Sequence, residues 1–289
     1  MKSFLTECTK HLRSSLTRHG CTIGRYKSTA FADRERGYLL KEDVKGESIA
    51  IIASVLPEPE SLFDLLALHR LLSENGAAEI DLIVPYLGYA RQDRSDGKGT
   101  AGIGVMVTEL LRQTKASRLL VCDIHSERIR KALGPSVIEL SALPFIAAAV
   151  AKRPPEVIVA PDAGSVARAR RLAELLAPHP EVALIDKARP RPNVAVAKRL
   201  QGDVRGKNVL IVDDMIDTGG TLVEAIKLVL ENGAATIRIA ATHGIFSGGA
   251  RERLSHLPVS EILVTNTLPQ VRHPKIRCLD IVPSLLAIG

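Results

Sequence analysis

The chain has 289 residues, enough for two domains of ordinary size, and 46% of them are hydrophobic. Aromatic residues make up only 3% and tryptophan is absent, so the cores must be mainly aliphatic. The net charge of +7 suits a polyanionic small molecule as well as a nucleic acid. Because base stacking needs aromatic side chains, we expect no nucleic-acid partner.

The four cysteines, at positions 8, 21, 122 and 278, are scattered and form no C-x-x-C pair. This spacing argues against a zinc site and against a disulfide framework, and it suits a reducing compartment. The longest apolar runs are too short to span a membrane, and the N-terminus lacks the apolar core of a signal peptide. We therefore expect a cytoplasmic protein with no membrane partner.

Apolar periodicity predicts a helix at residues 4–16 and a hairpin or strand pair at 26–42. The strands predicted after them are 48–56, 79–86, 118–121, 157–160, 182–185, 209–212, 262–264 and 276–281. The predicted helices are 61–74, 105–113, 142–150, and two that follow Ser165 and Thr221. Strands alternate with helices, so the expected fold class is α/β with mainly parallel sheets.

An internal repeat indicates duplication of one α/β unit. LSENGAAEIDLIVPYLGYA, from Leu72, parallels LENGAATIRIAATHGIF, from Leu230. In each copy a helix ends in Glu-Asn-Gly-Ala-Ala, where Asn-Gly is a natural helix stop, and a strand follows. Only the second copy is preceded by the sequence DDMIDTGGT.

The sequence DDMIDTGGT lies between a predicted buried strand and a predicted helix. Its polar and glycine residues are Asp213, Asp214, Asp217, Thr218, Gly219, Gly220 and Thr221. Converging backbone N–H groups and a helix N-terminus can hold a phosphate. Adjacent carboxylates would repel a phosphate, but they can accept hydrogen bonds from hydroxyls or face a divalent cation. Together these features predict a ribose 5-phosphate site, and the alternative is an ordinary capped helix.

Three further segments carry polar residues where ligands of α/β sheets bind, beyond the carboxyl ends of strands. PDAGS, at residues 161–165, can present N–H groups to an anion while Asp162 faces a cation or a hydroxyl. His125 follows a predicted strand and is either a metal ligand or a structural residue. Lys187 and Arg189 lie on a basic, proline-punctuated segment, either solvated or folded over charge that develops in phosphoryl transfer.

The order of these motifs resembles that of the ribose-phosphate diphosphokinases, also called phosphoribosyl diphosphate synthetases. The motifs that carry the resemblance are PYLGYARQDR, DIH, PDAGSVARAR, DKARPRPNVA, GDVRGKNVLIVDDMIDTGGTL, THGIFSGGA and TNTLP. The family transfers the β,γ-diphosphoryl group of ATP to the C1 hydroxyl of ribose 5-phosphate and releases AMP. Its fold is two similar α/β domains, each like a type I phosphoribosyltransferase, which agrees with the repeat.

The resemblance implies a role for each motif. Residues 218–221 would hold the 5-phosphate, and Asp213 and Asp214 the ribose hydroxyls. Residues 162–165 would face the diphosphate and Mg²⁺, with His125 as a second metal ligand. Lys187 and Arg189 would close over the transferring group as the catalytic pair.

The ATP site implied by the resemblance lies in the first half of the chain. It would use Phe31, Asp33 and Glu35, which match the family's adenine element F-x-D-G-E, together with Arg91, Gln92 and Asp93. Arg34 stands at the glycine of that element and departs from the family's pattern. A neighbouring subunit often supplies the adenine element, so a homo-oligomer is expected, either a dimer or a hexamer built from dimers.

We place the N-terminal domain at residues 1–140 and the C-terminal domain at 141–273, with 274–289 packing back on the first domain. Two other functions compete with the synthetase. A phosphoribosyltransferase would give the first half no role, and the segment GYARQDR separates the synthetases from that class. A non-catalytic, regulatory relative would usually lose loop or catalytic residues, whereas Lys187, Arg189 and the TGGT turn are present.

Overall fold

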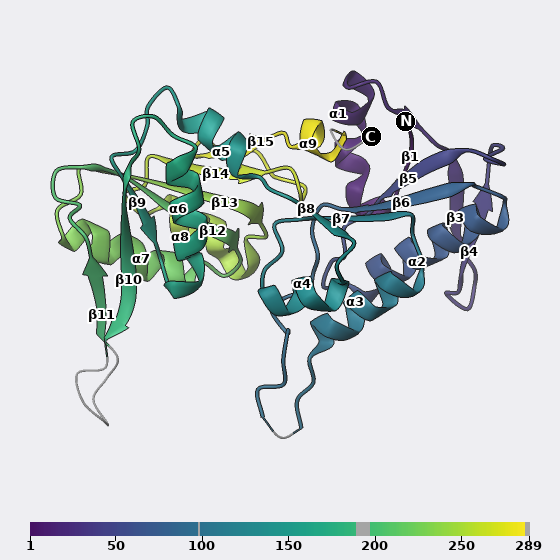
Figure 1. Cartoon of the computed structure of the whole chain (residues 1–289), viewed down its shortest axis with the longest axis horizontal. Helices are drawn as coiled ribbons and strands as arrows, with labels where there is room; N and C mark the ends of the chain where they lie inside the picture. Colours follow the sequence, from purple (N-terminus) through teal and green to yellow (C-terminus); the bar gives the residue numbers. More distant parts are fainter. Residues whose placement is uncertain (98, 189–196, 287–289) are drawn as a thin grey trace. The chain divides into compact units, whose positions relative to one another are not determined.

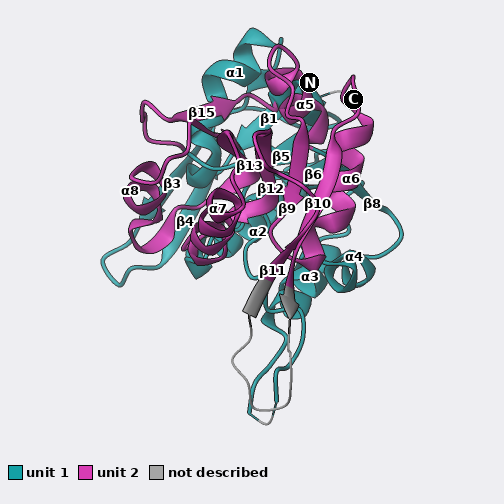
Figure 2. Cartoon of the chain, turned by 90° about the vertical axis from the view of Figure 1, so that its left-hand side faces the viewer, with its two compact units in different colours: residues 1–141, 267–269, 282–289 teal, residues 142–266, 270–281 magenta. Residues whose placement is uncertain are grey.

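The computed structural model describes residues 1–97, 99–188 and 197–286, except for the side chains of residues 187, 188, 197 and 198. The chain divides into two compact units (Figure 2). Unit 1 comprises Met1–Ser141, Thr267–Pro269 and Val282–Gly289, and unit 2 comprises Ala142–Asn266 and Gln270–Ile281. None of the described helices is long and apolar enough to cross a membrane.

Unit 1 is built on a parallel sheet of six strands (Figure 1). In spatial order they are β2 (Thr22–Ile23), β1 (Lys2–Leu5), β5 (Ser48–Ile52), β6 (Glu79–Val84), β7 (Arg118–Cys122) and β8 (Val137–Leu140). Its helices are η1 (Glu7–Leu12), α1 (Arg13–Arg18), α2 (Pro59–Glu74), α3 (Ile103–Gln113), α4 (Glu127–Leu133) and α9 (Val282–Leu286). The predicted hairpin is confirmed as the antiparallel pair β3 (Tyr26–Ala30) and β4 (Arg36–Leu40).

Unit 2 is built on a sheet of seven strands, all parallel except β11 at one edge. In spatial order they are β11 (Ala197–Gln201), β10 (Glu181–Ala188), β9 (Val157–Ala160), β12 (Asn208–Ile216), β13 (Thr236–Gly244), β14 (Glu261–Thr265) and β15 (Ile276–Leu279). Its helices are α5 (Leu143–Val150), η2 (Ala163–Ser165), α6 (Val166–Glu174), α7 (Gly220–Glu231), η3 (Ser247–Gly249) and α8 (Ala250–Ser255). The α/β fold with mainly parallel sheets is therefore confirmed.

The two sheets share one strand order. We count only the parallel strands of each sheet, in chain order, and so leave out the hairpin β3–β4 and the edge strand β11. In both sheets the second strand then lies on one side of the first, and the third to sixth strands follow in sequence on its other side. Unit 2 differs only by the added antiparallel strand β11. The common order, found independently of the sequence repeat, supports duplication of one α/β unit.

The repeated Asn-Gly sequence ends the equivalent helices α2 and α7 in the same way. Asn75 Nδ2 donates to the carbonyl of Leu71 at 2.8 Å, and Asn232 Nδ2 donates to the carbonyl of Leu228 at 2.7 Å. The glycine that follows each asparagine has φ of +82°. This left-handed conformation is strained for residues that carry a Cβ, which explains why glycine occupies both positions.

Both faces of the unit 2 sheet are buried, and successive residues of a strand point to opposite faces. Val157 and Val159 of β9 belong to a core formed with α7 and α8, whereas Ile158 and Ala160 belong to a core formed with α5 and α6. The runs VIVA and VLIV are apolar without a break because both of their faces are covered.

The N-terminal prediction was wrong in part. Residues 4 and 5 belong to strand β1 and not to a helix, and helical structure begins only at Glu7. Phe4 is fully buried among residues of β5 and β6, so pairing of β1 with β5 determines its conformation. Tertiary context overrides local helical spacing here.

The C-terminal segment is shared between the units. We expected residues 274–289 to pack on the N-terminal domain, but β15 pairs in parallel with β14 and belongs to unit 2. Only the part from Val282 onward, which contains α9, belongs to unit 1. The first boundary lies between Ser141 and Ala142.

The helix stops give a stability prediction. Gly76→Ala and Gly233→Ala should each lower the free energy of unfolding by about 1 kcal/mol, because alanine is strained at φ of +82°. A Cβ at either position would make only ordinary contacts, at 3.4 Å to Lys45 Cγ and 3.5 Å to Arg205 Cγ, so no clash contributes. Urea denaturation measures the effect. Arg34→Gly is the opposite control, because Arg34 has φ of +74° and glycine should not lower stability there.

Candidate functional site

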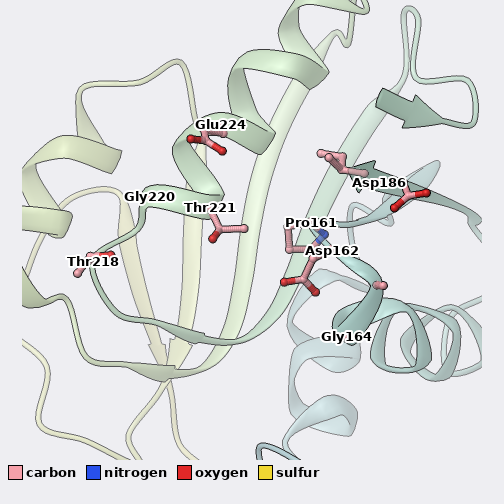
Figure 3. A pocket seen from close by; sticks show the side chains of 10 residues that line it. Pro161, Asp162, Gly164, Asp186, Thr218, Gly220, Thr221 and Glu224 are labelled. Carbon is pink, nitrogen blue, oxygen red and sulfur yellow. The ribbon is translucent and has the colours of Figure 1, made fainter. Parts of the chain in front are cut away.

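A cavity of about 650 Å³ opens in unit 2 between the turn after β9 and the turn after β12 (Figure 3). It is lined by Pro161, Asp162, Ala163, Gly164, Ile185, Asp186, Thr218, Gly220, Thr221 and Glu224. Thr218, Gly220, Thr221 and Glu224 approach from the α7 side, and Asp162 and Asp186 lie opposite them (Figure 3). Two segments that the sequence analysis selected separately therefore share one cavity.

The acidic pair lies inside a strand and not after it. Strand β12 continues to Ile216, and Asp213 pairs with Ala241 of β13. The prediction that the strand ends at Val212 was therefore wrong. Apolar patterning missed the extension because Asp213 and Asp214 interrupt the hydrophobic run while the backbone stays paired. Consequently the pair is half-buried and held by the sheet.

The TGGT turn, residues 218–221, has the geometry of an anion site. Gly219 has φ of +75° and is the N-cap of α7, and its carbonyl accepts the N–H of Val223 at 2.9 Å. Within the described part of the chain, no hydrogen bond is found for the N–H groups of Gly220 and Thr221. Free amides at a helix N-terminus are the groups that bind a phosphate.

The turn after β9 is held by its own aspartate. Asp162 is the N-cap of η2, and its Oδ1 accepts the N–H of Ser165 at 3.0 Å. Its side chain is exposed and points into the cavity (Figure 3). Ser165 is buried, with 5% of its surface exposed.

The hydroxyl of Ser165 connects the two turns. Ser165 Oγ lies 3.1 Å from Asp162 Oδ1 and 2.9 Å from Asp213 Oδ1. A hydroxyl carries a single hydrogen, so it donates to one carboxylate at a time. A proton held on Asp213 completes the second contact.

The environment of Asp213 favours that proton. Burial in the first place, and the neighbouring charge of Asp214 in the second, raise the pKa of Asp213 from its ordinary value near 3.8 to about 7. Hydrogen bonds from Ser165 and from the N–H of Asp214 act in the opposite direction but are weaker. Asp213 therefore has a pKa near neutrality in the absence of ligand.

The expected catalytic pair is only partly visible. Lys187 lies in β10, where its backbone pairs with Lys198 of β11, but its side chain lies outside the described structure. Arg189 lies wholly outside the described residues. The segment before them differs from the prediction, because β10 continues through Ala188 instead of ending at Ile185.

The expected adenine element lies at the tip of the β3–β4 hairpin in unit 1. Phe31 is 57% exposed, and Asp33 Oδ1 accepts the N–H of Glu35 at 3.0 Å. Arg34 has φ of +74°, the conformation that the family's glycine adopts readily. Arg34 therefore adopts a backbone conformation that glycine takes more readily, and it adds a charge at the tip of the hairpin.

A buried carboxylate anchors the hairpin to α2. Asp64, which is buried, accepts hydrogen bonds from Arg36 Nη1 at 2.6 Å and from the hydroxyl of Tyr38. Burial and the hydrogen bond to Asp64 raise the pKa of Tyr38 well above its ordinary range. The two β4 side chains fix the hairpin on the unit, and the sequence analysis did not identify this anchor.

The other expected residues of unit 1 lie at the carboxyl edge of its sheet. Arg91, Gln92 and Asp93 lie on the connection from β6 to α3, where the Gln92 carbonyl accepts the N–H of Gly104 at 2.9 Å. His125 is exposed and follows β7. Among the described residues there is no group of three or more His, Cys, Asp or Glu side chains that could hold a metal.

Glu224, Ile185 and Asp186 line the cavity but were not selected from the sequence. Glu224 lies three residues after Thr221 on α7, so helical spacing alone places it on the same face as the turn. Ile185 ends the predicted strand, and Asp186 begins the extension that patterning missed. Asp162 and Asp186 make the side of the cavity opposite the TGGT turn acidic, and Glu224 adds a carboxylate on the α7 side.

Sequence comparison assigns the chain to a family. Residues 2–114 match the N-terminal domain of ribose phosphate pyrophosphokinase, and residues 178–287 match the phosphoribosyl synthetase-associated domain. The ribose-phosphate pyrophosphokinase of Caldanaerobacter subterraneus is 36% identical over 281 residues, which cover 96% of this chain and 88% of that protein. The ribose-phosphate pyrophosphokinase of Aquifex aeolicus is 38% identical over 265 residues, which cover 90% of this chain and 84% of that protein.

The chain belongs to the ribose-phosphate pyrophosphokinase family. Structural comparison agrees with this assignment. The phosphoribosylpyrophosphate synthetase of Mycobacterium smegmatis superposes with a TM-score of 0.90 at 29% identity, covering 99% of this chain and 96% of that one. The resemblance found in the motifs therefore extends over almost the whole chain.

The titration of Asp213 gives a prediction about stability. Because the folded pKa lies above the unfolded one, the folded state binds more protons between about pH 4 and pH 7, and stability falls as pH rises through that window. Asp213→Asn should abolish the fall and make the protein about 1–3 kcal/mol more stable than the wild type at pH 8. The difference should vanish near pH 4. Thermal unfolding in chelator, without ligands, measures it.

Asp203→Asn is the matched control. The N–H of Arg205 lowers the pKa of Asp203, so this carboxylate stabilises the fold above its unfolded pKa and loses that contribution as pH falls. Its replacement should lower stability at pH 8, the opposite sign to Asp213→Asn. Equal stability of the wild type and Asp213→Asn across the whole pH range would contradict the assignment.

Proposed function

We propose that the protein is a ribose-phosphate diphosphokinase. It transfers the diphosphoryl group of ATP to the C1 hydroxyl of ribose 5-phosphate, giving 5-phosphoribosyl 1-diphosphate and AMP. The observation that carries the proposal is the single cavity shared by the Asp162 turn and the TGGT turn, joined through Ser165 and Asp213. Membership of the family supports the same reaction.

Ribose 5-phosphate fits the polarity of the cavity. The N–H groups of Gly220 and Thr221 at the start of α7 bind the 5-phosphate, and the hydroxyl of Thr221 adds a donor. Asp213 and Asp214 accept hydrogen bonds from the ribose hydroxyls, and Asp217 completes the acidic side of the loop. The phosphate and the hydroxyls thus meet opposite ends of one loop.

The reaction is an in-line displacement at phosphorus. The C1 oxygen forms a bond to the β-phosphorus of ATP, the bond from that phosphorus to the α,β-bridging oxygen breaks, and AMP leaves with the bridging oxygen. The C1 hydroxyl gives up its proton to solvent or to a carboxylate. Lys187 and Arg189 place positive charge against the transferring group, and positioning supplies most of the rate enhancement.

ATP is assigned to residues of unit 1. Phe31 offers an exposed ring for the adenine base, and Asp33 and Glu35 offer acceptors for its amino group. Arg91, Gln92 and Asp93 lie on a loop at the carboxyl edge of the parallel sheet, where ligands of α/β folds bind. The anchoring of β4 by Asp64 supports this role, because it holds the hairpin in a defined position.

Mg²⁺ fits the donors present. Asp162 directs an exposed carboxylate into the cavity, and His125 is an exposed imidazole beside a strand end. Mg²⁺ needs few protein ligands because it keeps waters and binds substrate phosphates, so a single carboxylate in the cavity is compatible with it. When bound, it neutralises charge on the diphosphoryl group.

The cellular setting follows from the substrates and the family. ATP and ribose 5-phosphate are the small-molecule partners, and the protein works in the cytoplasm as a homo-oligomer, either a dimer or a hexamer built from dimers. No nucleic-acid or membrane partner is needed for the reaction. A phosphoribosyltransferase is the weaker alternative, because the family match includes residues 2–114 in unit 1.

The reaction is tested by incubating the protein with ATP, ribose 5-phosphate and Mg²⁺. AMP should appear one-for-one with phosphoribosyl diphosphate. Lys187→Ala should lower kcat by about 100-fold or more while the circular dichroism spectrum stays unchanged, because a cation that neutralises transition-state charge is lost. Lys152→Ala, which replaces an exposed lysine of the same unit, is the control and should retain full activity. Absence of AMP with every nucleotide and metal tested would refute the synthetase assignment.

The metal assignment is tested separately. Asp162→Asn should raise the Mg²⁺ concentration needed for half-maximal activity by about tenfold, because an ionised ligand is replaced by a neutral one. Chelation of Mg²⁺ should abolish turnover, and added Mg²⁺ should restore it. An unchanged Mg²⁺ requirement in Asp162→Asn would remove Asp162 from the metal site.

A further inference from the structure

Helix α8 packs directly behind the TGGT turn. A Cβ placed on Gly219 would lie 3.3 Å from Leu254 Cδ1 and 3.5 Å from the Cβ of Ala250. Leu254 and Ala250 are fully buried, so the contact surface is fixed. The position of Gly219 is therefore determined by α8 as well as by strand β12, which leads into the turn.

One side chain of α8 holds the backbone of the turn. Arg253 Nη2 donates to the carbonyl of Thr218 at 3.0 Å and to the carbonyl of Gly248 at 2.9 Å. The nitrogen carries two hydrogens, so both bonds form at once. Gly248 precedes α8 and has φ of +56°, so Arg253 joins the TGGT turn to the turn that starts its own helix.

The hydrogen bond from Arg253 to the carbonyl of Thr218 also fixes the direction of the N–H of Gly219. The peptide unit between Thr218 and Gly219 is planar and trans, so its carbonyl and its N–H point in opposite directions. A carbonyl directed at Arg253 requires the N–H of Gly219 to point away from α8. Thr218 and Gly220, on either side of Gly219, line the cavity.

We infer that Arg253 is a positioning residue for the phosphate end of the site. It fixes the Thr218–Gly219 peptide so that the Gly219 N–H joins those of Gly220 and Thr221 in binding the 5-phosphate. The inference rests on the proposed function for the identity of the ligand. Because the guanidinium is charged, its hydrogen bond to the carbonyl is stronger than a neutral one and also polarises the N–H toward an anion.

This arrangement places a cation behind the turn and not inside the cavity. Arg253 acts through the peptide, so its loss should affect binding of the phosphate and leave the chemistry at C1 unchanged. A role limited to stability would instead alter all kinetic constants together or none of them. Measurement of Kd, KM and kcat therefore distinguishes a positioning role from a role limited to stability.

The experiment compares Arg253→Met with the wild type. Isothermal titration calorimetry with ribose 5-phosphate should show Kd raised about tenfold, and steady-state assays should show a similar rise in KM for ribose 5-phosphate. The KM for ATP and kcat should change by less than about twofold. Arg253→Lys keeps donors and charge, and it should recover most of the affinity.

Arg171→Met is the matched control, because Arg171 is an exposed arginine on α6 of the same unit and does not line the cavity. It should leave Kd unchanged. Thermal unfolding identifies a variant that fails to fold. If Arg253→Met does not fold, Arg253→Gln, which has no charge, takes its place, and its Kd should be raised relative to both the wild type and Arg253→Lys.

The outcomes separate this inference from the proposed reaction. Equal Kd for wild type and Arg253→Met overturns the positioning role, as does a fall in kcat with no change in Kd. If the wild type binds ribose 5-phosphate but forms no AMP, the reaction fails, and the calorimetric comparison still decides the role of Arg253.

Discussion

The strand order of unit 2 determines where its chemistry lies. Strand β9 leads through α6 to β10 on one side, whereas β12 leads through α7 to β13 on the other. Because parallel crossovers share one hand, α6 and α7 cover opposite faces of the sheet, as the two separate cores show. The turns after β9 and β12 therefore diverge at the switch point and leave the cavity between them.

The same constraint places Asp213 beside the turn after β9, because β9 and β12 are neighbours in the sheet and Ser165 Oγ lies 2.9 Å from Asp213 Oδ1. The sheet buries the residue among paired strands, and burial beside Asp214 makes a second negative charge costly. Ser165 offers one hydroxyl hydrogen to two carboxylates, so a proton or a ligand must complete the contacts. Under the proposed function a ribose hydroxyl is a suitable donor, and it would take the place of that proton.

Unit 1 has the same strand order, but its switch point is filled by its own chain. Ser54, after β5, is fully buried and donates to the carbonyl of Thr267 at 3.3 Å. The connection that follows contains Pro57 and Pro59, which lack the N–H groups that an anion site needs. In unit 2 the equivalent turn, which follows β12, lines the cavity.

The sequence alone was sufficient for the α/β class, the repeat and the two turns, because buried parallel strands and Gly/Thr turns leave strong local patterns. It was insufficient where pairing overrides pattern. Phe4 lies in a strand because β5 pairs with it, and Asp213 and Asp214 stay in β12 although they break the apolar run. Helical spacing could have predicted that Glu224 lines the site. No local pattern could have predicted the role of Arg253, because its contact with Thr218 spans 35 residues of sequence.

The distribution of charge around the cavity follows from these placements. Asp162 and Asp186 line the side of the cavity opposite the TGGT turn, and Glu224 lies on the α7 side, while the turn itself presents backbone N–H groups and has a cation, Arg253, behind the Thr218–Gly219 peptide. A lysine or arginine inside the cavity would attract the diphosphate of a nucleotide as strongly as the phosphate of the sugar. Neutral amides in a fixed turn select by geometry, so under the proposed function the turn holds the one phosphate that fits it.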